Sequence, residues 1–210
     1  MSTQARIITE FSSIAPPAWD QLDTAGNPFL EYAFLAGLEQ TGSIGAHAGW
    51  HPRHLALFES GQLTGFAPAY AKDNSHGEFV FDWAWADAYH RNGLNYYPKL
   101  LTGVPYTPVT GPRLLTIKGH PARSEIKTRL KDLALQECEK NGYSTWHCNF
   151  LEDEDFEPLK AAGFLCRTDW QFHWTNRGYG TFDEFLDDLR SRKRKSIPVS
   201  YTHLRAHETT

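Results

Sequence analysis

Residues 70–113 read YAKDNSHGEFVFDWAWADAYHRNGLNYYPKLLTGVPYTPVTGPR and combine many aromatic residues with a few charged ones. The charged residues include Asp82, Asp87, Lys99 and Arg113. Aromatic walls with a few convergent polar groups are typical of ligand clefts, but β-strands also favour aromatic residues. The stretch therefore indicates either a binding cleft or an aromatic sheet that packs on helices.

The residues just before this stretch predict a β-hairpin. Residues 54–58 and 63–71 are strand-like runs joined by the turn sequence ESGQ. Pro68 lies inside the second run and indicates an edge position or a bulge. Residues 78–85 predict a further strand, whose alternation would place Asp82 on the face opposite Trp83 and Trp85.

Helices and strands follow one another through the rest of the chain. Residues 121–140 carry apolar residues on one helical face, and Asn141-Gly142 is a helix end signal. Further expected elements are a strand at 5–11, a helix from Asn27-Pro28, a strand at 144–150, a helix at 155–162, a strand at 164–175 and a helix from Phe182. Helices and strands are therefore mixed along the chain.

Charge excludes general nucleic-acid binding but leaves one local exception. The chain has 210 residues and a net charge of −4, which suits one domain with a real core and no overall attraction to phosphate. Arg190–Lys195 nevertheless contains five positive charges in six residues. This basic run either contacts a phosphate-rich partner such as tRNA or forms a solvated connection between two domains.

Cysteine usage and hydropathy predict a cytoplasmic protein. The three cysteines, Cys138, Cys148 and Cys166, show no CxxC spacing, which favours a reducing compartment. The N-terminus does not resemble a secretory signal. No apolar run approaches the roughly 20 residues that span a membrane.

Three further patterns are weaker. His47, His51 and His54 have a metal-like spacing, but Gly49 and Pro52 prevent one shared helix face, so no metal is expected. Lys118-Gly119 precedes the long helix and could face a phosphate, or could simply form the helix entry. No GxSxG nucleophile motif occurs.

Asp82 is the candidate general base. A carboxylate beside indole rings is partly desolvated, and we expect this to raise its pKa into a usable range. The alternative is that Asp82 or Asp87 caps the next helix. Lys99 and Arg113 either bind an anionic substrate group or are solvated surface charges.

The last residues do not continue the preceding helical pattern. Pro198 should break the helix, and PVSYTHLRAHET from Pro198 to Thr209 looks like the translated end of a sequencing adapter. We therefore expect a gene truncated near Ile197 and an artefactual, disordered tail over 198–210.

Several segments together resemble a known family. NPFLEYAFLAGLEQTGSIG, GWHPRHL, HGEFVFDWAWADAYHRNGLNYYPKLL, VPYTPVTGPRLL and FLDDLRSRKRKSI, in this order, resemble the FemAB-like predicted N-acyltransferases of bacteria, which have GNAT-type halves. The resemblance implies the α/β class, with a GNAT-like mixed sheet flanked by helices. It also implies an N-terminal domain over 1–180, the start of an inter-domain helix over 181–197, and relatives of about twice this length.

The implied function is transfer of an acyl or aminoacyl group to an amine, on a peptidoglycan-type precursor. The implied donors are acyl-coenzyme A or aminoacyl-tRNA, the latter held through Arg190–Lys195. The fragment itself is expected to be inactive. The alternatives are a non-catalytic substrate-binding half-domain and a tRNA-binding module.

Site roles follow from this reaction. Asp82 would be the base, and Tyr96, Tyr97 or Tyr106 the proton donor. The expected substrate-binding residues are Trp83, Trp85, Asp87, Lys99, Thr110 and Arg113. Lys118 and Gly119 would bind the cofactor, although the Q/RxxGxG/A loop of GNAT enzymes is missing.

Overall fold

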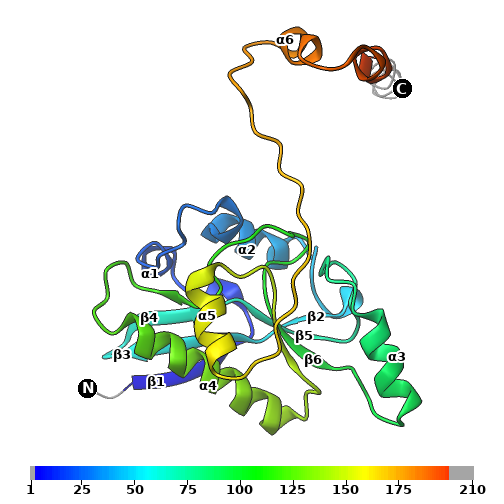
Figure 1. Cartoon of the computed structure of the whole chain (residues 1–210). Helices are drawn as coiled ribbons and strands as arrows, with labels where there is room; N and C mark the ends of the chain where they lie inside the picture. The colour runs from blue at the N-terminus through cyan, green and yellow to red at the C-terminus, as the bar shows by residue number, and fades with distance from the viewer. Residues whose placement is uncertain (1–2, 199–210) are drawn as a thin grey trace. The chain divides into compact units, whose positions relative to one another are not determined.

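The centre of the fold is the predicted hairpin of β3 (His54–Glu59) and β4 (Gln62–Ala67), seen in a computed structural model that describes residues 3–198 (Figure 1). Its turn uses Ser60 and Gly61 at φ values of 50° and 84°, a left-handed conformation that glycine adopts without steric cost. β1 (Thr3–Ile8) pairs antiparallel with β3, and β7 (Leu115–Thr116) pairs with β4, which gives the sheet order β1-β3-β4-β7.

A second sheet continues the first one. It has the order β2-β5-β6-β8, with β2 (Trp50–Pro52), β5 (Ala69–Lys72), β6 (Lys99–Thr102) and β8 (Trp146–Cys148). The Arg53 N–H donates to the carbonyl of Ala69 at 2.8 Å, and the Gly103 N–H donates to that of Pro68 at 3.1 Å. Pro68 thus lies at the junction of β4 and β5, a break in the strand rather than a sheet edge.

The mixed sheet flanked by helices that the resemblance implies is confirmed. β6 and β8 are parallel, and the intervening α4 (Arg123–Asn141) makes the crossover that parallel strands need. The predicted helix at 121–140 and strand at 144–150 therefore both form, with shorter bounds. The predicted helix at 155–162 forms as α5 (Asp153–Ala161).

Alternating side chains bury both faces of the first sheet. Ala56 and Phe66 pack with Trp19 and Leu35 from α1 (Pro16–Trp19) and α2 (Tyr32–Gln40). Leu55, Leu57 and Ala67 point the other way and pack with Ile126, Leu130 and Ala134 of α4. The short helices therefore cover one face and α4 covers the other (Figure 1).

The predicted cap at Asn27 is confirmed, but the helix it begins is short. The Asn27 side chain accepts a hydrogen bond from the Phe29 N–H at 3.0 Å, and Pro28–Leu30 forms a single 3-10 turn. The next helix, α2, is separate: it begins at Tyr32 and ends at Gln40.

The strand predicted at 78–85 is wrong. Residues 78–82 form neither strand nor helix, and α3 (Trp83–Arg91) begins directly after Asp82. β5 pairs with β2 and β6, and β6 pairs with β5 and β8, so both edges of β5 and of β6 are already hydrogen-bonded. Phe79 also has a φ of 55°, which interrupts an extended chain.

The chain divides into two compact units, Met1–Leu165 and Cys166–Thr210, so the first unit ends before the expected boundary at 180. Residues 165–177 contain no helix or strand, so the strand predicted at 164–175 does not form within the described residues. The helix predicted from Phe182 forms as α6 (Phe182–Asp187), and residues 191–198 are helical again. Apart from Pro198, the predicted tail lies outside the described residues.

No helix among residues 3–198 is long and apolar enough to cross a membrane.

Candidate active site

A group of buried charged side chains lies on the second sheet. Lys72 and Lys99 are direct partners in the β5–β6 register, so both project from the same face. Glu78 and Asp82 reach them from the irregular segment before α3. At most 3% of each of these four residues is exposed. The group holds two positive and two negative charges, so its formal charges balance.

Lys99 is at the centre of this group. Its Nζ donates to Ser75 Oγ at 3.0 Å, to Glu78 Oε2 at 2.9 Å and to Asp82 Oδ2 at 2.5 Å. A lysine ammonium has three donors, so all of them are engaged inside the protein. Lys99 therefore holds the two carboxylates instead of presenting a cation to an anionic substrate, as the sequence had led us to expect.

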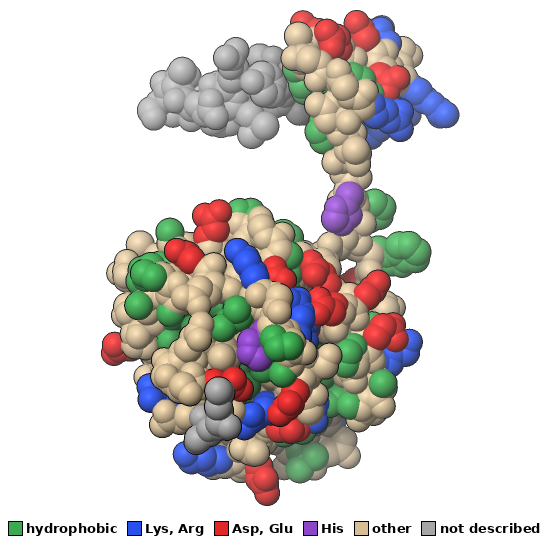
Figure 2. Space-filling view, turned by 90° about the vertical axis from the view of Figure 1, so that its left-hand side faces the viewer, with side chains coloured by type: hydrophobic (Ala, Val, Ile, Leu, Met, Phe, Trp, Pro, Cys, Tyr) green, Lys and Arg blue, Asp and Glu red, His purple; other side chains and the backbone are tan. Residues whose placement is uncertain are grey.

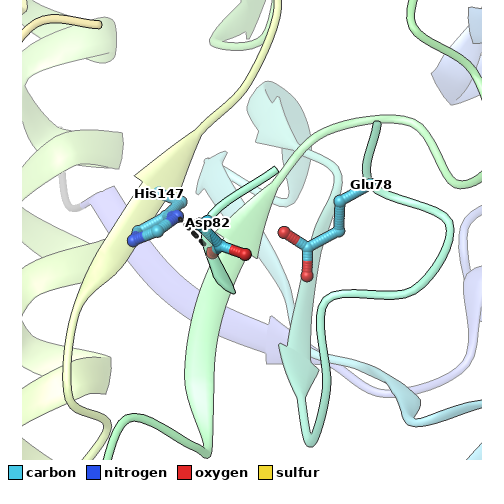
Figure 3. Close-up of side chains that lie close together, drawn as sticks. All are labelled: Glu78, Asp82 and His147. Carbon is cyan, nitrogen blue, oxygen red and sulfur yellow. Dashed lines mark ion pairs between the residues drawn. The ribbon is translucent and has the colours of Figure 1, made fainter. Parts of the chain in front are cut away.

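Asp82 connects Lys99 to Tyr96 and His147. The Tyr96 hydroxyl donates to Asp82 Oδ2 at 2.6 Å and lies 3.3 Å from His147 Nε2. His147 Nδ1 lies 3.9 Å from Asp82 Oδ2. Figure 3 shows Asp82 between the imidazole of His147 and the carboxylate of Glu78. We call the set Lys72, Ser75, Glu78, Asp82, Tyr96, Lys99 and His147 the Lys99 cluster.

Two buried acceptors in the cluster have no hydrogen-bond partner in the described part of the chain, Glu78 Oε1 and Asp82 Oδ1. Buried polar atoms are normally hydrogen-bonded, so each such atom needs an explanation. Carboxylate oxygens accept hydrogen bonds from cationic N–H groups most strongly. The cluster can therefore take up an additional donor, such as an amine.

The pKa values separate the two carboxylates. Burial raises the pKa of Glu78 and outweighs the nearby Lys99 ammonium. Burial also acts to raise the pKa of Asp82, but hydrogen bonds from Lys99, Ser75 and Tyr96 together lower it. The expected net rise in the pKa of Asp82 is therefore wrong, because these donors stabilise the ionised form.

The second lysine is less well paired. Lys72 Nζ donates to the carbonyl of His76 at 3.3 Å and lies 3.7 Å from the ring centroid of Trp50. Burial, together with repulsion from Lys99, lowers the pKa of Lys72 to about 8 although Glu78 opposes this shift. Burial, followed by its hydrogen bond to Asp82, raises the pKa of the Tyr96 hydroxyl.

The predicted tyrosines divide between two places. The Tyr97 hydroxyl lies 2.8 Å from Ser75 Oγ, next to the cluster, and burial raises its pKa. The Tyr106 hydroxyl donates to the carbonyl of Ser43 at 3.2 Å, and its ring lies 5.7 Å from that of Trp50. The Tyr106 ring thus lies beside Trp50, and the backbone N–H of Tyr106 donates to the carbonyl of Gly77 at 3.0 Å, next to Glu78.

Exposed aromatic residues surround the start of α3. Trp83 and Trp85 are 46% and 49% exposed, and His76 lies 5.3 Å from the Trp83 ring. Asp82 stands at the N-cap position of α3, but its side chain makes no capping hydrogen bond there. Asp87 is exposed inside the helix, so it does not cap α3 either.

Arg113 is buried, and its guanidinium contacts backbone carbonyls. Its guanidinium donates to the carbonyls of Asn149, Pro112 and Val109, and the residue is 0% exposed. Asp155 accepts the N–H groups of Arg113 and Leu114 at 2.7 and 3.1 Å. Arg113 therefore braces the loop before β7 and is not placed to bind a substrate anion.

The remaining predicted site residues lie on the surface. Thr110 is exposed in the same loop, and Lys118 and Gly119 are exposed in the turn before α4. Arg123, the first residue of α4, forms ion pairs with Asp23 and Glu154. Acidic groups thus already stand at the helix entry where a phosphate was expected.

Glu78, Asp82 and His147 could also supply metal ligands, since their donor atoms lie within 4.8 Å of one another. The Lys99 ammonium already lies between the two carboxylates, so a metal ion would have to displace it. His51 and His54, from the expected histidine spacing, instead contact Asp73 and Glu39 at 2.6 and 3.0 Å.

Two surface hollows of about 220 and 460 Å³ lie elsewhere, one between β1 and α4 and one around β1, α1 and β4. We place the site at the Lys99 cluster because charge and hydrogen bonding converge there. The cluster comes nearest to solvent at His147, whose side chain is 23% exposed, and at the half-buried Tyr97.

The fold and the cluster define an α/β protein with a buried, charge-balanced site. The chain belongs to the FemAB-like family, described as peptidoglycan biosynthesis/recognition, whose model matches residues 10–209. The resemblance stated from the sequence is therefore confirmed. A search of curated proteins gives no match.

Several solved structures are similar to this chain at low sequence identity. One is a ribosomal-protein-alanine N-acetyltransferase from Brucella melitensis biovar Abortus 2308, at 13% identity over 84% of this chain and 100% of that one, with a TM-score of 0.43. Another is the aminoglycoside N-acetyltransferase AAC(6')-Iy in complex with CoA, at 14% identity over 84% and 95%, with a TM-score of 0.43. A third, an aminoglycoside acetyltransferase from an uncultured soil metagenomic sample, has 16% identity over 84% and 99% and a TM-score of 0.46.

Proposed function

We propose that the Lys99 cluster binds an acceptor amine, and that the chain is the acceptor-binding part of an N-acyltransferase. The observation that supports this most directly is the pair of buried, unpartnered oxygens, Glu78 Oε1 and Asp82 Oδ1. An ammonium group of the acceptor would give both atoms a charged donor. The partly exposed His147 stands at the entrance and would meet the same amine.

The pKa directions assign the roles. Asp82 stays ionised at neutral pH because its pKa is lowered, so it suits holding the acceptor ammonium more than accepting a proton. An imidazole is the commonest general base, and His147 lies next to Asp82 and Tyr96. We therefore assign the role of general base to His147 and the binding of the amine to Asp82.

The reaction balances with these groups. The ammonium gives one proton to His147, and the neutral amine attacks the carbonyl carbon of the thioester or ester donor. A C–N bond forms, and the C–S or C–O bond breaks. The leaving thiolate or alkoxide takes a proton from Tyr97 or from the protonated His147, and the same group then takes the second proton of the attacking nitrogen. The proton that remains on His147 leaves to solvent, so the net reaction releases one proton. Neither Glu78 nor Lys99 changes charge in this scheme.

The aromatic rim would bind the remainder of the acceptor. Trp83 and Trp85 offer half-exposed rings beside the cluster, and such rings pack against sugar or peptide groups. The family description, peptidoglycan biosynthesis/recognition, favours a peptidoglycan-type amine over other acceptors. Asp87 and Thr110 are exposed and available for further polar contacts.

The donor is either acyl-coenzyme A or aminoacyl-tRNA. Lys118 at the entry to α4 is exposed and could meet a phosphate. The exposed basic run Arg190–Lys195 could meet tRNA. A filter-binding titration with aminoacyl-tRNA would separate them, since neutralising Arg192 and Lys193 should weaken binding only if tRNA is the donor.

The test combines binding with turnover. The protein is titrated with a muramyl peptide that carries a free amine, and thiol release from acetyl-coenzyme A is measured in parallel. Asp82→Asn should weaken acceptor binding by at least tenfold because the amine loses its ionic partner. Asp20→Asn, the same change at an exposed position directly after α1, is the matched control and should have no effect.

The outcomes also separate the alternatives. If His147→Gln stops thiol release but leaves acceptor binding intact, the cluster is catalytic. If the acceptor binds through Asp82 and no thiol or tRNA is released with either donor, the chain is a substrate-binding module. If folded Asp82→Asn protein binds the acceptor as well as the parent does, the cluster is not the acceptor site.

A further inference from the structure

Residues 166–174 have the pattern of a β-strand without forming one. Even positions carry Cys166, Thr168, Trp170, Phe172 and Trp174, and odd positions carry Arg167, Asp169, Gln171 and His173. Alternation with period two is typical of a strand with one buried face. The structure leaves this segment extended, without a strand assignment.

The apolar face of this segment is exposed. Trp170 is 90% exposed, Phe172 101% and Trp174 65%. Figure 2 shows hydrophobic side chains standing out along the narrow extended part of the chain. Three neighbouring aromatic residues exposed in this way mark an interaction site. We call residues 167–175 the aromatic segment.

We propose that the aromatic segment pairs antiparallel with the same segment of a second copy of this chain. The register is centred on Gln171, which faces its own counterpart across a twofold axis. Such a contact is isologous, so each pairing occurs twice. Odd residues then face odd residues and even residues face even ones, which keeps both aromatic rows on one face of the ribbon.

The side chains favour this register over its neighbours. Centred on Gln171, Asp169 faces His173 and Trp170 faces Phe172, each pair occurring twice. Aromatic pairs and hydrogen-bonding polar pairs directly opposite each other stabilise neighbouring strands. A register centred on residue 169 or 173 would instead place Asp169 or His173 opposite itself. Registers centred on 170 or 172 lose the contact between Asp169 and His173.

The size of the contact predicts a weak dimer. A Trp or Phe side chain can bury about 150–250 Å², and side-by-side packing in a two-stranded ribbon covers only part of that area. The contact therefore falls at the lower end of interface sizes, roughly 1,000 Å² or less. We expect a dimer with a Kd on the order of micromolar.

Sedimentation velocity of the full chain over a hundredfold concentration range tests self-association. The dimer fraction should rise with concentration, and Phe172→Lys should raise the Kd at least tenfold because charged residues block strand pairing. Leu135→Lys is the control, since Leu135 is a 42% exposed apolar residue of α4 in the other unit. It should leave the Kd unchanged.

Disulfide trapping tests the register. In a Cys166→Ser background, the double variant Asp169→Cys/His173→Cys should form a covalent dimer rapidly, because directly opposed residues suit disulfide geometry. Asp169→Cys alone should cross-link slowly. A chain that stays monomeric throughout, a dimer insensitive to Phe172→Lys, or equal trapping of the double and single variants would each overturn the proposal. The far-UV spectrum of each variant confirms that it is folded.

Discussion

At the residue scale, Lys99 and Lys72 experience opposite surroundings although they are neighbours in the β5–β6 register. Lys99 contacts both carboxylates of the cluster, whereas Lys72 contacts a backbone carbonyl and the face of Trp50. Removing a charge from water costs several kcal/mol unless a partner compensates. Lys99 therefore holds the cluster together, and Lys72 is the cation that burial penalises.

Replacing Lys99 by Met should strongly destabilise the protein. Glu78 and Asp82 would remain buried without their shared cation, and breaking a buried ion pair costs about 3–5 kcal/mol. Urea unfolding at neutral pH measures this loss. Lys118→Met, on an exposed turn, should change the free energy of unfolding by less than about 0.5 kcal/mol. A loss below about 1 kcal/mol for Lys99→Met would contradict the central role of Lys99.

Lys72 should make stability depend on alkaline pH. Its pKa falls from 10.5 to about 8 on folding, so the unfolded chain binds more protons between these values. Stability therefore rises with pH across that window. Below about pH 8 the amine is charged in both the folded and the unfolded state, so the burial penalty of Lys72 is at its full size and no longer changes with pH.

The measurement is the difference in unfolding free energy between the parent protein and Lys72→Met from pH 7.5 to 9.5. Taking the difference cancels other groups that titrate equally in both proteins. The parent should gain stability relative to the variant as the pH rises. A flat difference, or one with the opposite slope, would show that Lys72 is not penalised by burial.

The site was only partly visible in the sequence for a physical reason. Asp82, Tyr96, Tyr97 and Lys99 stood out because polar groups among aromatic residues are unusual. Lys72 and His147 stand at the end of one strand and inside another, and only the pairing of β5, β6 and β8 brings them together. The Glu78 carboxylate is buried because it accepts a hydrogen bond from Lys99, which lies 21 residues further along the chain. A local sequence pattern could not predict this contact.

At the element scale, the strength of the local pattern decided which predictions held. The hairpin of β3 and β4 and the helix α4 formed because turn residues, alternation and helical periodicity agreed. The strand at 78–85 failed because the φ of 55° at Phe79 interrupts an extended chain and α3 begins directly after Asp82. The segment 164–175 has strand alternation, but no strand is assigned to it in the described structure.

The contact of α4 with the sheet depends on Gly65. A Cβ atom at Gly65 would lie 2.5 Å from Ile126 Cγ2 and 3.4 Å from Leu130 Cδ1. Gly65→Ala should therefore push α4 away from β4 and lower the free energy of unfolding by about 1–3 kcal/mol. Thermal unfolding followed by circular dichroism measures this change.

Gly37→Ala is the matched control. Gly37 lies inside α2, and no atom lies within 4 Å of a Cβ added there. Alanine should stabilise that helix by about 0.5–1 kcal/mol because it restricts the unfolded chain. If both substitutions shift stability in the same direction, close packing at Gly65 is not what limits the position of α4.

At the scale of the whole molecule, the two units differ in how they are stabilised. The three clusters of buried apolar side chains take all their members from residues between Ile7 and Trp146. On the face of the first unit that Figure 2 shows, acidic and basic side chains are interspersed. The second unit instead combines short helices with an extended segment of exposed aromatic residues. Folding and association should therefore be separable.

A chain that ends at Leu165 tests this separation. Because it keeps the three core clusters and the Lys99 cluster, its melting temperature should stay within about 4 °C of the first transition of the full chain. It should also remain monomeric in sedimentation velocity at every concentration, since it lacks the aromatic segment. Loss of folding would show that residues after 165 stabilise the first unit. Retained self-association would place the dimer contact in the first unit, away from Trp170 and Phe172.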